Sequence, residues 1–371
     1  HGPVFQFSAQ FEQPRFLARD LRLQTTLSAE RGLEQAYNFI GGRLRGGVVW
    51  QPRPDFSIFP TYNLELYNLK GQRGSVDQTT APTLVLGCPD AVDGGDCNIS
   101  VSYLEQFIEL NRRDDPLAPR HGFYASLSLQ EGGGILQGNY DFVRVLPDLR
   151  GYYTFGPRER LTLAARLRMG TLLTFSNSES AIVNRFFAGG GASMRGFNAR
   201  RLAPMSQIRT TPDSSTDANV NPVDTIVPIG GNSLVETSVE LRVKLFSELT
   251  LALFHDSGLT GYGPLTFGAR KDDLLLESGR LFGDNHYQAV GFGLRYNTIV
   301  GPIRVDVARR LNIGQPLPIL GSSASEATTL DGWGDCFGLG IKKEDGVNVK
   351  RRYAGAPEGL CTFFLSIGEA F

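Results

Sequence analysis

Few residues of this chain have a type and spacing that could do chemistry, and the four cysteines are the first of them. They form two separated pairs, Cys88 with Cys97 and Cys336 with Cys361. Neither pair has the close spacing of zinc ligands, and the four histidines do not cluster beside them. Two disulfides in the loops of a protein from an oxidising compartment are therefore predicted, and four unpaired cysteines are the alternative.

Two further stretches contain residues that ligands use, but neither has the full pattern of a binding site. Residues 189–193 read Gly-Gly-Gly-Ala-Ser, without the lysine or the strand-to-helix setting of a phosphate loop. The acidic stretch from Asp90 to Asp96 lacks the ligand spacing of a calcium loop. The sequence therefore predicts no nucleotide, metal or other cofactor, and no catalytic residue.

The most specific constellation is a pair of acids with one arginine. Glu240 and Asp256 lie on two alternating segments joined by a short turn, and a turn centred on Glu248 would place them directly opposite each other. Like charges opposite each other in a sheet repel, so we expect a cation between them. Arg195 is the candidate, because one guanidinium can donate hydrogen bonds to two carboxylates. The alternative is that both acids are solvated and that Arg195 lies in a surface loop.

The elements that would position these residues are strands, because the dominant pattern of the chain has a period of two. Apolar and polar residues alternate over 5–12, 161–169 and 235–245. Such alternation gives a strand one apolar and one polar face. A soluble sandwich also alternates, but long segments, charged polar faces and aromatic residues near strand ends are typical of a membrane barrel around a polar lumen.

Length and composition agree with a barrel. The chain has 371 residues, of which 41% are hydrophobic and 20% charged, and its net charge is −1. These fractions exclude a disordered chain, and the lack of a basic excess argues against a nucleic-acid binder. No run approaches the roughly 18 apolar residues of a membrane-spanning helix, which a membrane barrel does not need.

Thirteen strands are predicted, and the connections between them alternate in length. Short turns follow every second strand, and long loops are expected at 70–98, 176–231, 258–286 and 310–359. Short turns on one side and long loops on the other are the layout of an outer-membrane barrel, and this layout places both cysteine pairs on the external side. The predicted strands are 3–12, 20–30, 37–50, 57–69, 99–110, 121–132, 138–153, 158–175, 232–246, 249–257, 287–297, 301–309 and 360–371.

The basic residues on the polar faces are expected to line the lumen as a solvated wall. These residues are Arg166, Arg168, Arg242, Lys244, Arg295 and Arg304. His255 has the opposite parity and lies near a strand end, so we expect it at the outer interface. His121 is expected to shape the turn before Gly122.

Residues 185–197 read Arg-Phe-Phe-Ala-Gly-Gly-Gly-Ala-Ser-Met-Arg-Gly-Phe. They resemble the signature loop of the Omp85 superfamily, which ends in an Arg-Gly-Phe or Arg-Gly-Tyr tip. Further segments resemble the same family in the same order, at 115–123, 230–258, 293–306 and 363–371. The resemblance implies an all-β fold, a transmembrane antiparallel β-barrel of sixteen strands, in the bacterial outer membrane.

The resemblance also implies roles for individual residues. Arg195, Gly196 and Phe197 would form a functional loop that reaches into the lumen, where Arg195 meets the acidic partners Glu240 and Asp256. At the end of the chain, Gly368 and Phe371 would belong to the terminal-strand signal for barrel insertion.

A count of the strands relates this chain to the family barrel. The signature loop follows the eighth predicted strand and five strands come after it, whereas in the family it follows the eleventh of sixteen. Residues 1–371 are therefore expected to form one Omp85-type barrel that starts near the fourth family strand. The first three strands are expected upstream of His1 or from another chain, and the periplasmic POTRA domains are expected upstream.

The function that the resemblance implies is insertion or translocation of outer-membrane proteins, without catalysis. A weak seam between the first and last strands would expose backbone groups that template an incoming strand of a β-barrel or autotransporter-like substrate. Expected partners are outer-membrane lipid, unfolded outer-membrane proteins and periplasmic or lipoprotein accessory subunits, but no nucleic acid. Residues 228–234 and 301–304 favour the TamA branch of the family over the BamA branch.

Several rival functions stay open. A two-partner secretion transporter would carry a helical plug and two POTRA domains upstream, and a patatin-like fusion would carry an upstream lipase domain. A passive porin lacks the Arg-Gly-Phe loop. A soluble β-sandwich adhesin, the remote alternative, would not need detergent.

Overall fold

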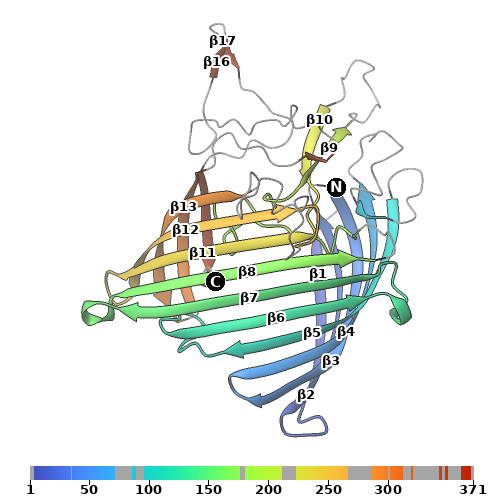
Figure 1. Cartoon of the computed structure of the whole chain (residues 1–371), viewed down its shortest axis with the longest axis horizontal. Coiled ribbons are helices and arrows are strands. Elements are labelled where there is room, and N and C mark those ends of the chain that lie inside the picture. Colours follow the sequence, from blue (N-terminus) through green and yellow to red (C-terminus); the bar gives the residue numbers. More distant parts are fainter. Residues whose placement is uncertain are drawn as a thin grey trace.

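Thirteen antiparallel strands form one curved sheet in the computed structural model of the chain (Figure 1). The structure describes residues 4–34, 36–71, 86–88, 96–175, 180–210, 223–265, 286–299, 301–311, 319–320, 342–344, 347–349 and 361–368. Each strand of the sheet pairs with its neighbours in chain order, from β1 at one end to β18 at the other. The strands are β1 (Phe5–Pro14), β2 (Leu21–Leu33), β3 (Tyr37–Arg53), β4 (Phe56–Gly71), β5 (Asp96–Asn111), β6 (Gly122–Gly132), β7 (Phe142–Phe155), β8 (Leu161–Thr174), β11 (Ser233–Lys244), β12 (Leu249–Gly261), β13 (Tyr287–Thr298), β14 (Gly301–Arg310) and β18 (Cys361–Ile367).

All thirteen predicted strands are confirmed, and their ends differ from the prediction by a few residues. The longest extension is in β12, which continues to Gly261 instead of ending at residue 257. Residues 256–261 are buried on both faces, so the alternation that marks the rest of this strand is lost there. Strand β7 begins late, at Phe142, because Asn139 turns away and donates its main-chain N–H to the carbonyl of Ser100 (2.8 Å).

The remaining elements are short and lie in the connections. Strands β9 (Met205–Thr210), β10 (Val223–Pro228) and β15 (Ile319–Leu320) form a small sheet, and β16 (Lys342–Glu344) pairs with β17 (Val347–Val349). Two 3-10 turns, η1 (Gly134–Leu136) and η2 (Pro157–Glu159), complete the described elements. Within the described residues, no helix is long and apolar enough to cross a bilayer.

The register between β11 and β12 differs from the prediction. Ser238 lies opposite Asp256, and Glu240 lies opposite Phe254, so the expected pairing of Glu240 with Asp256 is wrong. The reason is the turn, in which the N–H groups of residues 245 and 246 both donate to the carbonyl of Leu249 (2.9 and 3.1 Å) and centre the hairpin on Ser247. Because the difference amounts to two residues, both acids keep their inward parity.

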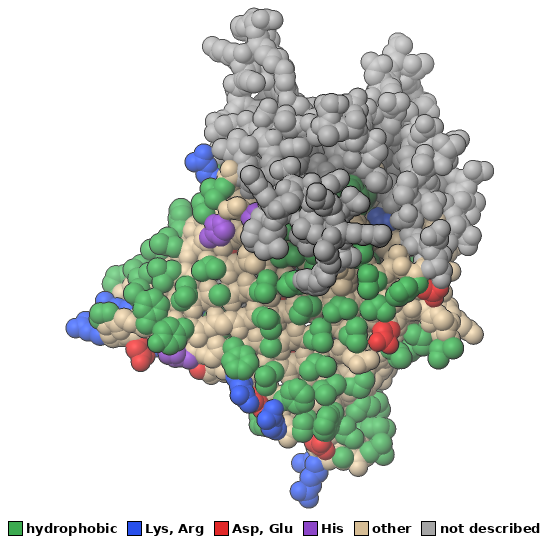
Figure 2. Space-filling model, viewed as in Figure 1, with side chains coloured by type: hydrophobic (Ala, Val, Ile, Leu, Met, Phe, Trp, Pro, Cys, Tyr) green, Lys and Arg blue, Asp and Glu red, His purple; other side chains and the backbone are tan. Residues whose placement is uncertain are grey.

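The outer face of the sheet is apolar and the inner face is polar. Outward side chains such as Val239, Leu253 and Phe292 are 48%, 48% and 52% exposed. Figure 2 shows hydrophobic side chains spread over this face, with most of the visible lysine and arginine side chains along the edge away from the grey region. An apolar outer band around a polar interior is what a lipid-facing barrel wall requires.

The core of the molecule lies inside the barrel, between the wall and the connection from β8 to β11. From this connection, Ile182, Phe186, Phe197 and Leu202 are each at most 2% exposed. They belong to one hydrophobic cluster with inward residues of the wall. These wall residues include Leu69, Val101, Phe142, Leu172 and Leu234. The connection is therefore a packed part of the fold.

A disulfide between Cys88 and Cys97 fastens a short piece of chain against this core, and the predicted pairing is confirmed. Tyr140 donates its hydroxyl to the carbonyl of Gly87 (2.7 Å), and the N–H of Ile182 donates to the carbonyl of residue 86 (3.1 Å). The second predicted pair cannot be compared in full, since Cys336 lies outside the described residues, as does the acidic stretch 89–95. Cys361 is disulfide-bonded and buried at the start of β18.

Replacing both Cys88 and Cys97 by serine is expected to lower the free energy of unfolding by about 2–3 kcal/mol, because the disulfide closes a loop between residues with a sequence separation of 9 in the unfolded chain. Urea unfolding of the detergent-solubilised protein measures this difference. Wild-type protein treated with reductant should lose at least as much stability as the variant, because reductant also opens the disulfide of Cys361. An unchanged midpoint in both samples would contradict the prediction.

Candidate functional site

The tip of the connection from β8 to β11 is formed by Met194, Arg195, Gly196 and Phe197. Two glycines with φ of 102° and 108°, at positions 189 and 190, turn the chain toward the tip. The N–H of residue 190 donates to the carbonyl of Phe197 (2.8 Å), which closes the loop on itself. Glycine adopts such positive φ values without the steric cost that other residues incur.

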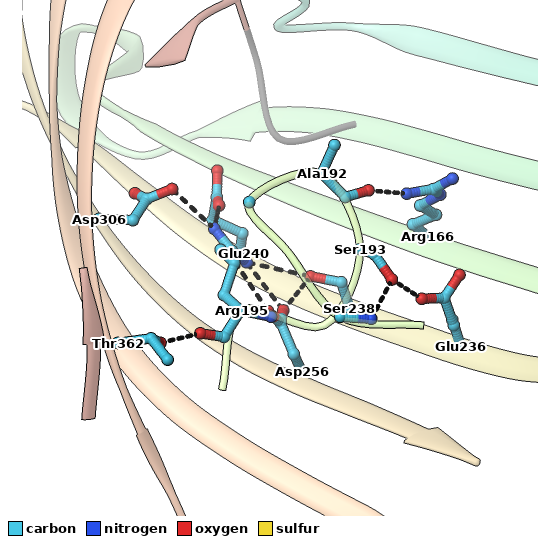
Figure 3. Close-up of polar contacts among 12 residues, drawn as sticks. Arg166, Ala192, Ser193, Arg195, Glu236, Ser238, Glu240, Asp256, Asp306 and Thr362 are labelled. Carbon is cyan, nitrogen blue, oxygen red and sulfur yellow. Dashed lines mark hydrogen bonds and ion pairs between the residues drawn. The ribbon is translucent and has the colours of Figure 1, made fainter. Parts of the chain in front are cut away.

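Arg195 lies between acids of the inner wall (Figure 3). Its Nε and one terminal nitrogen donate to the two carboxylate oxygens of Asp256 (2.7 and 2.8 Å), and its main-chain N–H adds a third bond to that carboxylate (3.0 Å). Its other terminal nitrogen donates to Glu240 (2.8 Å) and lies 3.7 Å from Asp306. The guanidinium carbon also sits 3.3 Å from the ring centre of Phe254, as a cation–π contact requires. One side chain thus engages three strands.

The wall supplies three further cations to the same acids. Arg242 donates to Glu240 (2.6 Å), and Arg295 donates to the other oxygen of that carboxylate (2.8 Å). Arg304 forms an ion pair with Asp306 (3.2 Å). We call these seven residues the lumen cluster: Arg195, Glu240, Arg242, Asp256, Arg295, Arg304 and Asp306.

The lumen cluster corrects the expectation of a solvated wall of basic residues. Arg242, Arg295 and Arg304 are only 5%, 1% and 2% exposed, and Glu240 is fully buried. Burial of a charge costs several kcal/mol, and only close pairing offsets that cost. The sequence interpretation missed this because it assumed an open lumen, whereas the loop and its tip fill the space in front of these side chains. Arg168 and Lys244 are less enclosed than the arginines of the cluster.

Four carbonyl groups of the loop accept hydrogen bonds from wall side chains. Arg304 donates to Gly191 (2.9 Å), and Arg166 donates to Ala192 (2.9 Å). The hydroxyl of Thr362 donates to Arg195, and Arg310 donates to Gly196 (2.7 Å). The donors come from β8, β14 and β18, so the backbone of the loop is held from several sides of the lumen.

Beside the tip, Ser193 contacts a second group of ion pairs on the wall. Its hydroxyl donates to Glu236, which also accepts a hydrogen bond from Arg168 (3.2 Å). Nearby, Asp148 accepts bonds from Arg150 and Arg166 (2.8 Å each). Through Ser193 and Arg166 the loop is thus bonded to β11 and to β8.

Gly196 and Phe197 each have a steric role at the tip. A Cβ atom on Gly196 would lie 2.5 Å from the Cβ of Ala289 on β13, so only glycine fits there without displacement. Phe197 is 1% exposed and packs edge-on against Tyr287, with ring centres 5.6 Å apart. The guanidinium carbon of Arg310 lies over the face of the Phe197 ring, 4.1 Å from its centre.

The other predicted site residues lie at the end of the chain and on the outer face. Gly368 follows β18 with φ of 96°, and its N–H donates to the carbonyl of Pro302 (2.7 Å). Phe371 lies outside the described residues. His255 is exposed and contacts Gln288 (3.1 Å).

Several residues of the site were not singled out from the sequence. Asp306 and Arg310 share the inward parity of Arg304 on β14, so the alternation of that strand was a usable signal. Thr362 had no such signal, because a lone hydroxyl on a strand indicates no partner. Among the described residues, no group of three or more histidines, cysteines or acids is arranged to hold a metal ion.

Comparison with known proteins gives matches over most of the chain. A model of the Omp85 superfamily domain matches residues 4–315. The outer membrane protein assembly factor BamA of Neorickettsia risticii (strain Illinois) is 24% identical over 322 residues, which cover 83% of this chain and 37% of the relative. BamA of Nitratidesulfovibrio vulgaris (strain Hildenborough) is 25% identical over 175 residues, which cover 47% of this chain and 18% of the relative.

A solved structure has the same architecture. BamA from Haemophilus ducreyi lacking POTRA domains 1-3 superposes with a TM-score of 0.63 at 16% identity, over 83% of this chain and 58% of that one. This likeness shows the fold. The chain spans less than half the length of the two curated relatives. Both of them are named BamA, so they give no support to the sequence preference for the TamA branch.

Replacing Arg195 by methionine is expected to destabilise the barrel by about 3–5 kcal/mol, because Asp256 then stays buried without its cation. Arg195→Lys should restore only part of this loss, since an ammonium cannot present a planar fork to two carboxylates. Heat-modifiable gel mobility and urea unfolding measure the effect.

The geometry also predicts how the stability changes when the acids are replaced together with Arg195. Arg195→Met with Asp256→Asn should be milder than Arg195→Met alone, because the unpaired charge is removed too. Adding Glu240→Gln should lower the stability again, since Arg242 and Arg295 both pair with that carboxylate. If all three variants unfold like wild type, the ion pairs do not hold the loop.

Gly196→Ala is expected to destabilise the protein by about 1–3 kcal/mol, since the added methyl overpacks against Ala289 on β13. Gly191→Ala is the matched control in the same loop, because its Cβ would meet its nearest neighbours at 3.4 Å, an ordinary contact. Equal midpoints of urea unfolding for the two variants would show that close approach at Gly196 is unimportant.

Proposed function

The chain belongs to the Omp85 superfamily, and from that membership we propose that it assists the assembly of other outer-membrane proteins. It is an integral protein of the bacterial outer membrane, as its family and its lipid-suited outer face indicate. Its substrates would be unfolded outer-membrane proteins, and its partners would be membrane lipid and accessory factors of the assembly machinery. The support for this proposal is the match to assembly factors over most of the chain.

The observation that carries the proposed mechanism is the pairing of the last strand of the sheet. In the described part of the chain, β18 pairs only with β14. An edge strand presents a row of N–H and C=O groups that can pair with another strand. An incoming strand of a substrate would add to this edge through main-chain hydrogen bonds, which tolerate different side chains.

The lumen cluster would support the edge from inside. Thr362 of β18 donates to the carbonyl of Arg195, and Arg304 connects the carbonyl of Gly191 with the hydroxyl of Ser366 (both 2.9 Å). The last strand is therefore bonded to the loop as well as to β14. We propose that this inner support keeps β18 in place while its outer edge is free for a substrate strand.

Export of a substrate through the lumen is less compatible with this geometry. At the level of the lumen cluster, Arg195, Met194 and Phe197 are each 1% exposed and packed against the wall. A secreted chain would have to displace the loop and break the ion pairs of Arg195 with Glu240 and Asp256. The same contacts argue against a passive pore.

A photocrosslinking amino acid at Ser366 on β18 is expected to capture a substrate during its insertion into proteoliposomes that contain this protein. The same group at Ser126 on β6 is the control, because β6 has partner strands on both sides. Crosslinked bands on denaturing gels, together with the yield of folded substrate, are the readouts. Equal capture at the two positions, or insertion no faster than into empty liposomes, would refute the proposal.

A further inference from the structure

A small cavity lies inside the barrel at the end of the short turns. Its volume is about 80 Å³. The turn from β5 to β6 and the turn from β7 to β8 form one side of it, and the ends of β8, β11, β12 and β13 form the other. The cavity thus sits in the lumen, between the lumen cluster and the solvent at this end of the barrel.

The charged residues that line the cavity are mostly basic. They are Arg120, Glu159, Arg160, Arg242, Lys244 and Arg295. The one acid among them, Glu159, is already paired with Arg120 (3.6 Å), which also donates to its main-chain carbonyl (2.6 Å). The cavity wall therefore carries a clear excess of positive charge.

Two of these cations lie at the mouth of the cavity and are held next to each other. The main-chain N–H of Lys244 donates to the carbonyl of Arg160 (2.8 Å). Both side chains are exposed, and neither takes part in a salt bridge within the described residues. Charges of one sign that converge in a recess raise the local concentration of oppositely charged groups.

The inner wall of the cavity adds two buried guanidiniums that share one carboxylate. Arg242 and Arg295 both pair with Glu240, and Arg195 pairs with the same carboxylate from the loop side. Together with the other members, the lumen cluster holds four guanidiniums and three carboxylates, an excess of one positive charge. An oxyanion in the cavity would share Arg242 and Arg295 with Glu240 and reduce this imbalance, and such charge-assisted hydrogen bonds are strong.

Hydrogen bonds within the chain itself hold the wall of the cavity in place. Arg242 donates to the carbonyl of Pro119 in the turn from β5 to β6 (3.2 Å). That turn is shaped by Asp114, whose carboxylate accepts the N–H groups of Asp115, Arg120 and His121 (2.9, 2.9 and 3.1 Å). Partial burial of Asp114 opposes its ionisation, but these N–H donors outweigh that effect and hold the pKa of Asp114 below its usual value.

We propose that this cavity is a binding site for a single small oxyanion, a carboxylate or a phosphate group that enters from the short-turn end of the barrel. Arg160 and Lys244 attract the group, and Arg242 and Arg295 bind it in the interior. The site does not depend on the assembly activity proposed above, because its test measures binding alone.

Equilibrium dialysis of the detergent-solubilised full chain against radiolabelled inorganic phosphate tests the proposal. The expected result is saturable binding of one phosphate per chain, together with a rise in apparent Tm of about 2 °C at ten times Kd relative to chloride at equal ionic strength. Arg160→Gln combined with Lys244→Gln should weaken binding about tenfold or more. Arg158→Gln should leave it unchanged, because this exposed arginine of the same turn does not line the cavity.

A second arm distinguishes the source of the oxyanion. N-acetyl-glutamate N-methylamide presents a carboxylate on a peptide unit, and its glutamine analogue is the neutral control. Competition with phosphate by the glutamate compound, but not by the glutamine compound, supports a carboxylate from a polypeptide. Competition by neither restricts the site to phosphate. Binding that does not saturate, or that is equal in wild type and in the Arg160→Gln and Lys244→Gln double variant, overturns the proposal.

Discussion

Inside this barrel, one fully buried carboxylate, that of Glu240, is shared by guanidiniums from the loop, from β11 and from β13. A buried ion is stable only while its partners stay in place, because removing one leaves an uncompensated charge. The position of Glu240 therefore depends on the register of β11, on the inward parity of β13 and on the turn that brings Arg195 into the lumen. None of these three features can change without disturbing the other two.

The packing of the molecule follows from the same arrangement. A membrane barrel cannot bury apolar side chains on its outer face against protein, since that face meets lipid. Here the loop from β8 to β11 supplies the missing core, with Phe186, Phe197 and Leu202 buried against inward wall residues. The polar part of the lumen lies below this core, where the loop exchanges hydrogen bonds with wall arginines.

Much of the fold was predictable from the sequence, because strand parity is a local property. Alternation alone located every strand of the sheet, and the spacing of the turns gave the order of short and long connections. The pairing of Glu240 with Asp256 was not predictable, since it depends on how two residues at a turn are hydrogen-bonded. Parity survives a two-residue error, so the acids were assigned to the correct face even though their opposite neighbours were wrong.

The burial of the wall arginines could not be predicted from the sequence for a different reason. Parity shows that Arg295 faces inward, but it does not show whether water or the loop lies in front of it. That depends on contacts between distant segments, such as those of Glu240 with Arg295 and with Arg195, which lie 55 and 45 positions from it in the chain. Local patterns carry no information about such contacts, whereas a family resemblance carries some, as it did for Arg195.

The hydrogen bond from Thr362 to the carbonyl of Arg195 joins residues 167 positions apart. It links the last strand of the sheet to the middle of the chain, so the bonds of the loop are complete only when β18 has docked. The formation of the loop is therefore coupled to the docking of β18: the loop cannot reach its final free energy before this strand arrives. In a folding intermediate in which β18 has not yet paired with β14, the carbonyl of Arg195 lacks the hydrogen bond from Thr362. Such an intermediate is therefore less stable than the native protein inside the lumen as well as at the edge of the sheet.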